Sequence, residues 1–165
     1  RAGRLIIRAI LTEKIIQIIA HAPSTNMEAM CRSVVKGAQS CKAEGITILC
    51  SSPFDTSAKE VVRSDGIILG TTENFGYMNG ALKDFFERIY YPCQGLMEGR
   101  PYMLFVRAGN DGKGAQKSVE AIATGLKWRK IQEPLICRGA WNLDFLIACE
   151  ELGKTMALGV EAGIF

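Results

Sequence analysis

Residues 65–89, DGIILGTTENFGYMNGALKDFFERI, contain an apolar run, a polar segment rich in glycine and asparagine, and an amphipathic pattern, in that order. A strand is predicted over about residues 65–71. Its apolar run at residues 66–70 is typical of a strand buried on both faces, because it is continuous rather than alternating. A helix is predicted after the polar residues 72–80, because apolar side chains recur there at helical spacing opposite charged ones. Strand, loop and helix in this order predict one unit of a parallel α/β sheet.

The same order recurs on both sides of this unit. Further strands are predicted from short apolar runs at residues 14–20, 46–50, 101–106 and 130–137. Further helices are predicted from a start near residue 27, over about residues 115–126 and over about residues 143–160. Residues 51–58 are expected to form a loop.

Strands that alternate with helices predict an α/β three-layer sandwich, in which a five-stranded parallel sheet has helices on both faces. Right-handed crossovers and the chain length favour the strand order 2-1-3-4-5 over a six-stranded dinucleotide-binding order. The 165 residues fit a single domain, residues 1–165. Residues 1–13 are set outside the expected core as an N-terminal extension.

Composition argues against several classes of partner. The net charge is +3, and the Lys and Arg residues are scattered among acids, so no nucleic-acid partner is expected. No segment approaches the ~20 apolar residues of a membrane span. The six cysteines form no C-x-x-C pair and no metal site, which favours a reducing, cytoplasmic setting. Cys50 and Cys137 lie in apolar runs and are expected to be core side chains.

Open parallel sheets bind ligands at the carboxyl ends of their strands, near the switch point of the strand order. The first such loop, residues 21–27, places hydroxyl and amide groups before a helix N-terminus, which favours a phosphate. In the alternative interpretation, Ser24 or Asn26 only caps the helix. His21 is expected to contact the phosphate without acting as an acid or base, because no second titratable group is spaced to form a dyad.

The loops after the third and fourth strands are suited to a flat ring. Phe75 and Tyr77 flank Gly76, where aromatic faces and an open backbone can approach a planar ligand. The alternative is that these rings fold back onto the core. Residues 107–114 hold three glycines, and their N–H groups could bind the polar edge of a ring while Arg107 stabilises negative charge. An ordinary turn is the alternative there.

Residues 70–88, GTTENFGYMNGALKDFFER, resemble the second FMN loop and following helix of the flavodoxin-like NAD(P)H:quinone and FMN reductases. That family carries the pattern G-[ST]-P-x-[YN]-x-G-x-[MP]-[SN]-[GA]-x-[LM]-K-x-[FW]. The first loop resembles the S-x-x-x-x-N-T phosphate loop of the family, and residues 107–114 resemble its T-G-x-x-x-G-G-x-E segment. The resemblance extends over about residues 14–165.

The resemblance implies a flavodoxin-like fold that holds FMN by its phosphate in the first loop and by its ring in the other two. It also implies NAD(P)H as the electron donor, a quinone or similar small-molecule acceptor, and a homodimer or homotetramer. No catalytic acid or base and no metal is expected. The implied FMN-binding residues are His21, Ser24, Thr25, Asn26, Met27, Thr71, Thr72, Glu73, Asn74, Phe75, Gly76, Tyr77, Met78, Arg107, Ala108, Gly109, Asn110, Asp111 and Gly112.

Two positions depart from the family pattern. Met27 stands where the family usually has a phosphate-binding Thr, which removes a hydroxyl and leaves only a backbone N–H. Thr72 replaces a common Pro, which is expected to loosen the second loop. Tyr90, Tyr91 and Trp141 are candidates for interface or substrate contacts, with ordinary packing as the alternative.

Two other functions fit the predicted fold. An electron-carrier flavodoxin is usually strongly acidic, and the net charge of +3 argues against it. A receiver or binding domain without flavin needs clustered acids after the first strand, where this chain has His21, Ala22 and Pro23. The sequence favours an FMN-dependent NAD(P)H oxidoreductase, with the electron carrier as the alternative.

Overall fold

The computed structural model describes residues 13–165, so the predicted N-terminal extension lies outside the described residues apart from Glu13. The strands are β1 (Lys14–Ala20), β2 (Ile46–Ser51), β3 (Gly66–Asn74), β4 (Tyr77–Met78), β5 (Pro101–Ala108), β6 (Arg129–Lys130) and β7 (Leu135–Arg138). The helices are α1 (Thr25–Ser40), α2 (Ala58–Arg63), α3 (Gly80–Cys93), α4 (Lys113–Gly125) and α5 (Asp144–Glu161), with a short 3₁₀ turn, η1 (Pro53–Asp55).

The parallel strands are arranged in the order β2-β1-β3-β5, and β6 and β7 both pair with the far side of β5. The predicted order 2-1-3-4-5 is therefore confirmed, with the fifth strand broken into two short pieces. Pro134 lies just before the second piece, and proline lacks the N–H that a continuous strand would donate. Among the strands of residues 13–165, only β4 is antiparallel, and it pairs with the end of β3.

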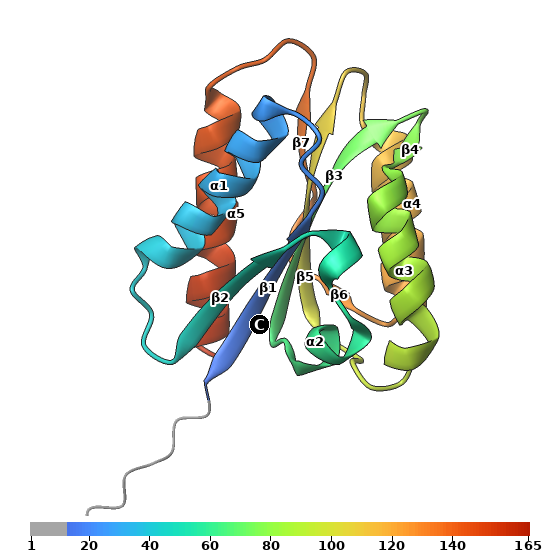
Figure 1. Ribbon diagram of the computed structural model, residues 1–165. Coiled ribbons are helices and arrows are strands. Elements are labelled where there is room, and N and C mark those ends of the chain that lie inside the picture. The colour runs from blue at the N-terminus through green and yellow to red at the C-terminus, as the bar shows by residue number, and fades with distance from the viewer. Residues whose placement is uncertain (1–12) are drawn as a thin grey trace, which may run out of the picture.

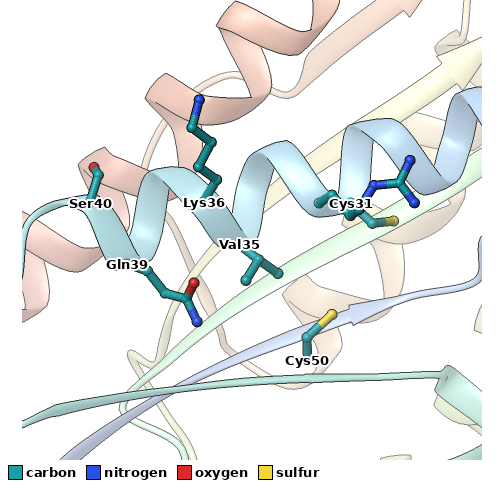
Figure 2. A pocket seen from close by; sticks show the side chains of 7 residues that line it. Cys31, Val35, Lys36, Gln39, Ser40 and Cys50 are labelled. Atoms are coloured by element: carbon teal, nitrogen blue, oxygen red, sulfur yellow. The ribbon is translucent and has the colours of Figure 1, made fainter.

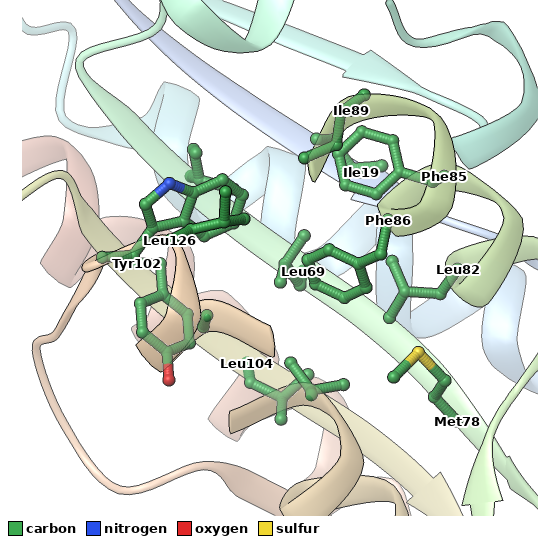
Figure 3. Packing of buried hydrophobic residues seen from close by; sticks show 14 of the residues in the cluster. Ile19, Leu69, Met78, Leu82, Phe85, Phe86, Ile89, Tyr102, Leu104 and Leu126 are labelled. Atoms are coloured by element: carbon green, nitrogen blue, oxygen red, sulfur yellow. The ribbon is translucent and has the colours of Figure 1, made fainter. Parts of the chain in front are cut away.

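Helices cover both faces of the sheet, which confirms the predicted three-layer sandwich (Figure 1). Ile16 and Ile18 of β1 pack with α1 and α5, whereas Ile19 packs with α3 and α4. This division follows from the alternation of side chains along a strand. On the second face, Leu69 and Leu104 of the sheet meet Phe85 and Phe86 of α3 (Figure 3).

Several local predictions need correction. Strand β3 runs three residues past the predicted end at Thr71 and turns into a hairpin, because its end pairs with β4. The segment predicted as a loop at residues 51–58 contains η1 and leads into α2. A capping box of Ser57 and Glu60 marks the start of α2. Cys50 is exposed rather than buried, since β2 is the edge strand, while Cys137 is buried as predicted. No described helix has the length and apolarity to span a membrane.

Helices α1 and α5 touch through their backbones at two glycines. A Cβ added to Gly37 would lie 1.8 Å from the Glu150 carbonyl oxygen, and one added to Gly153 would lie 2.0 Å from the Val34 carbonyl oxygen. Both neighbours are backbone atoms, which cannot rotate away as a side chain can. The close approach of the two helices therefore requires glycine at both positions.

We expect Gly37→Ala to lower the free energy of unfolding by about 1–3 kcal/mol, because the added methyl group overpacks the helix contact. This loss should appear although alanine favours a helix over glycine by about 1 kcal/mol. Denaturant unfolding measures the change. Gly80→Ala is the control, because a Cβ there meets nothing within 4 Å. A Gly37→Ala protein as stable as the wild type would contradict the observed contact.

Candidate functional site

The loops that follow β1, β3 and β5 lie beside one another at the carboxyl edge of the sheet (Figure 1). The register places Ala20 opposite Gly70, and Thr72 opposite Arg107, so the three strands end at similar heights. The structure therefore brings the three predicted segments to one edge. Each segment uses some of its polar groups internally and leaves others free.

In the first loop, Ser24 is the N-cap of α1, and its Oγ accepts a hydrogen bond from the Met27 backbone N–H at 3.3 Å. Thr25 and Asn26 are exposed. Within residues 13–165, neither their side chains nor their backbone N–H groups have a hydrogen-bond partner in the protein. The helix-cap interpretation is thus correct for Ser24, while Thr25 and Asn26 leave donors free at a helix N-terminus.

Met27 belongs to the core rather than to the loop surface. Its side chain is fully buried among α1, α5 and the sheet, and its backbone N–H is already bound to Ser24. The sequence predicted that the Met27 N–H would bind a phosphate, but this N–H already donates to Ser24. The departure from the family pattern has a packing reason, since a threonine would bury a hydroxyl at this position.

The second loop is a tight hairpin rather than a loose segment. The Oγ1 of Thr71 accepts a hydrogen bond from the Asn79 N–H at 3.0 Å, and Asn79 in turn caps α3 through Leu82. The Met78 N–H donates to the Oγ of Ser118 on α4 at 3.1 Å. Thr72 takes part as well, since its Oγ1 accepts from the Asn79 side-chain amide at 3.4 Å. The predicted loosening at Thr72 is therefore not observed.

The tip of this hairpin carries a strained and exposed aromatic residue. Phe75 and Gly76 have φ angles of 53° and 68°, so both lie in the left-handed region that a two-residue hairpin turn requires. A bulky side chain in that region is unusual and unfavourable. Phe75 is also fully exposed, and Tyr77 is partly exposed, so neither ring is folded back onto the core.

Four of the predicted ligand residues in the second and third loops are buried in the protein. Thr71, Met78 and Ala108 are buried, and so is Gly112, whose φ of 71° and closeness to Ile136 require a glycine. The exposed predicted residues are Asn74, Phe75, Gly76, Tyr77, Gly109, Asn110 and Asp111. The exposed face at this edge therefore consists of a hairpin tip and a glycine-containing turn.

Two charged residues of the predicted set act within the protein. Arg107 donates hydrogen bonds to the carbonyl oxygens of Cys137 and Gly139, at 3.0 and 2.7 Å, and its guanidinium lies 5.5 Å from the Phe145 ring centre. Trp141 lies on the same guanidinium at 6.0 Å. Arg107 thus holds the segment after β7. Glu73 reaches from β3 to the backbone at the start of α4.

One residue of the edge escaped the sequence analysis. Phe54 of η1 meets the His21 ring edge to face, with the ring centres 5.9 Å apart, and more than half of its surface is exposed. Arg88 of α3 holds this segment through the carbonyl oxygens of Pro53 and Thr56. The sequence feature that could have indicated Phe54 is its position directly after the second predicted strand, at the same carboxyl edge.

No protein-family model and no curated protein matches the sequence. Solved structures do match. A flavodoxin from the domain Archaea is similar over 89% of this chain and 99% of that chain, at 17% identity and a TM-score of 0.76. The WrbA-like flavodoxin of Agrobacterium tumefaciens is similar over 91% of this chain and 98% of that one, at 12% identity and a TM-score of 0.68.

The fold is flavodoxin-like. A flavodiiron protein from Giardia intestinalis is also similar, at 15% identity and a TM-score of 0.73, over 91% of this chain but only 36% of that longer chain. At such identities the similarity establishes the architecture alone. The chemistry of this flavodoxin-like fold must be inferred from its own residues.

A cavity of about 630 Å³ lies away from the carboxyl-edge loops, between α1 and the edge strand β2 (Figure 2). Cys31, Val35 and Cys50 line it together with the polar side chains of α1. Burial raises the pKa of Cys31 to about 12. The Cys50 residue is exposed, but the protein around its thiol excludes part of the water and raises its pKa as well, so both thiols stay protonated near neutral pH. Within residues 13–165, no cluster of His, Cys, Asp and Glu could hold a metal ion.

We expect Phe75→Asn to raise the free energy of unfolding by about 1 kcal/mol, because asparagine tolerates the left-handed conformation and Asn-Gly is favoured in such turns. Thermal or denaturant unfolding measures the gain. Phe75→Leu is the matched control, since leucine keeps a large apolar side chain without that tolerance. Equal stability of the Asn and Leu variants would contradict the strain at this position.

Proposed function

We propose that this chain binds FMN at the carboxyl edge of its sheet and acts as an NAD(P)H-dependent oxidoreductase. The observation that carries the proposal is the convergence of free donors at the α1 N-terminus with exposed aromatic side chains on the neighbouring hairpin. FMN has a doubly charged phosphate and a planar ring, and these two features fit that pair of surfaces. The similarity to flavodoxins and to a WrbA-like protein supports the same cofactor.

The phosphate would lie against the first turn of α1. The free N–H groups and side chains of Thr25 and Asn26 would donate hydrogen bonds to it, and the α1 dipole favours its negative charge. His21 borders the same loop and would contact the phosphate from the side of β1. Ser24 contributes mainly by fixing the helix start through its hydrogen bond to Met27.

The ring would lie between the hairpin and the β5–α4 loop. Phe75 and Tyr77 offer aromatic faces for stacking, and stacked aromatic pairs contribute about 0.5–1.5 kcal/mol beyond the area they bury. The exposed turn at Gly109, Asn110 and Asp111 offers backbone groups to the polar edge of the ring. Retention of a strained Phe75 supports a binding role, since asparagine or glycine would suit the turn better.

FMN supplies hydride and electron transfer, so the protein needs only to bind, orient and shield the reacting groups. Hydride transfer to the flavin does not require an acid–base pair of side chains. Large apolar side chains are exposed around it on three segments: Phe54, Phe75 and Leu143. This surface favours an uncharged, flat acceptor such as a quinone. We also propose a homodimer or homotetramer, in which a partner would cover part of this surface.

The electron carrier is the alternative function, with the same cofactor but a protein partner in place of a small acceptor. A net charge of +3 disfavours it, because docking on basic partners needs an acidic surface. Anaerobic addition of NADH or NADPH separates the two functions. The oxidoreductase loses its flavin colour upon addition, whereas a carrier keeps its colour until a reductase protein is supplied.

We expect the double variant Thr25→Ala, Asn26→Ala to bind FMN at least about tenfold more weakly, because hydrogen bonds to a charged phosphate are lost. Its stability without FMN should be unchanged, since these side chains have no protein partner within the described residues. Fluorescence titration with FMN measures the affinity.

Ser24→Ala is the control for this experiment. It should lower the free energy of unfolding by about 1 kcal/mol through loss of the helix cap, with a smaller effect on FMN affinity. A double variant that binds FMN as tightly as the wild type would refute the phosphate position. A wild-type protein that takes up no FMN would refute the proposed function itself.

A further inference from the structure

The start of helix α4 has one local cap, since the Lys113 N–H donates to the Asp111 side chain at 3.0 Å. Its N-cap is Gly112, which has a left-handed φ of 71° and makes no side-chain hydrogen bond. Its first turn contains no acidic residue. The Gly112 and Ala115 N–H groups are not bound by Asp111, so they need a partner from elsewhere in the chain. They lie next to the turn at residues 109–111.

Glu73 of β3 supplies that partner from about forty residues away. One carboxylate oxygen accepts a hydrogen bond from the Gly112 N–H at 3.3 Å, and the other accepts from the Ala115 N–H at 3.4 Å. Both oxygens are thus directed to the backbone of α4, and the negative charge lies at the positive end of the helix.

The hairpin and α4 are also in direct backbone contact. A Cβ added to Gly114 would lie 1.8 Å from the Gly76 carbonyl oxygen. Farther along the helix, Ser118 accepts the Met78 N–H at 3.1 Å. Glu73 completes this contact at the end nearest the exposed loops. The hairpin tip and the β5–α4 turn are therefore held as one unit.

We propose that Glu73 is a positioning residue that fixes the two ring-binding loops relative to each other and offsets the positive end of α4 beside the flavin ring. This inference rests on the proposed function. Glu73 acts through the backbone of Gly112 and Ala115, directly after the turn at residues 109–111, rather than by touching the ring, because both carboxylate oxygens already have protein partners. Its charge cancels part of the helix potential, which would otherwise favour added negative charge on the ring.

The first test needs no cofactor. Hydrogen exchange of the full-length protein without FMN should show faster exchange at Gly112 and Ala115 in Glu73→Ala than in the wild type. Glu60→Ala is the matched control, because Glu60 also caps a helix, α2, through the Ser57 N–H and Oγ. It should speed exchange near Ser57 only. Unchanged exchange at Gly112 and Ala115 in Glu73→Ala would overturn the inference.

The second test uses FMN and separates charge from geometry. Glu73→Ala should bind FMN about tenfold more weakly, as expected for the loss of a capping carboxylate. Glu73→Gln keeps one acceptor oxygen and should restore most of that affinity. Because the charge is gone, Glu73→Gln should also shift the midpoint potential of the flavin to more positive values. Glu60→Ala should change neither quantity.

The outcomes distinguish this inference from the proposed function. Wild-type affinity in Glu73→Ala, or an unchanged midpoint potential in Glu73→Gln, would overturn the role of Glu73 while FMN binding stands. Failure of the wild type to bind FMN would overturn the proposed function. Hydrogen exchange alone would then decide whether Glu73 joins the two loops.

Discussion

The pairing of β3 with β1 on one side and β5 on the other is the constraint on which the rest of the structure depends. Gly70 lies at its centre, where a Cβ would fall 2.2 Å from the Phe105 ring and 2.8 Å from the Ala20 Cβ. Glycine at this point leaves the space on β3 that the Phe105 ring occupies. Because the three strands are parallel and in register, their following loops converge at one edge.

The residues at that edge fall into two groups, those bonded to the protein's own backbone and those that are exposed. Ser24, Thr71, Asn79 and Glu73 bind backbone groups of their own chain, and they fix helix starts and hairpin geometry. Thr25, Asn26 and the hairpin tip are exposed, and we propose that they bind the ligand. A rigid frame of this kind lowers the entropy lost on binding, because the binding groups are already in place. The strain at Phe75 is tolerated because the pairing of Asn74 with Tyr77 holds both ends of the turn.

Features that follow from local periodicity could be predicted from the sequence. The apolar runs and amphipathic patterns predicted the three layers and the strand order. The composition of the loops indicated that the site lies at the carboxyl edge of the sheet. Features that depend on distant partners could not be predicted in this way. Glu73 bonds to residues about forty positions away, and Arg107 to Gly139, so neither role leaves a local pattern. The exposure of Cys50 follows from its place on the edge strand, which an apolar run does not reveal.

The central claim is that FMN binds the three loops at the carboxyl edge rather than the cavity between α1 and β2. The most direct measurement is a map of backbone amide chemical shifts in isotope-labelled protein as FMN is added. We expect shifts at Thr25, Asn26, Phe75 and Gly109, and none at Gln39 or Cys50. Shifts confined to the residues that line the cavity, or no shifts at saturating FMN, would contradict it.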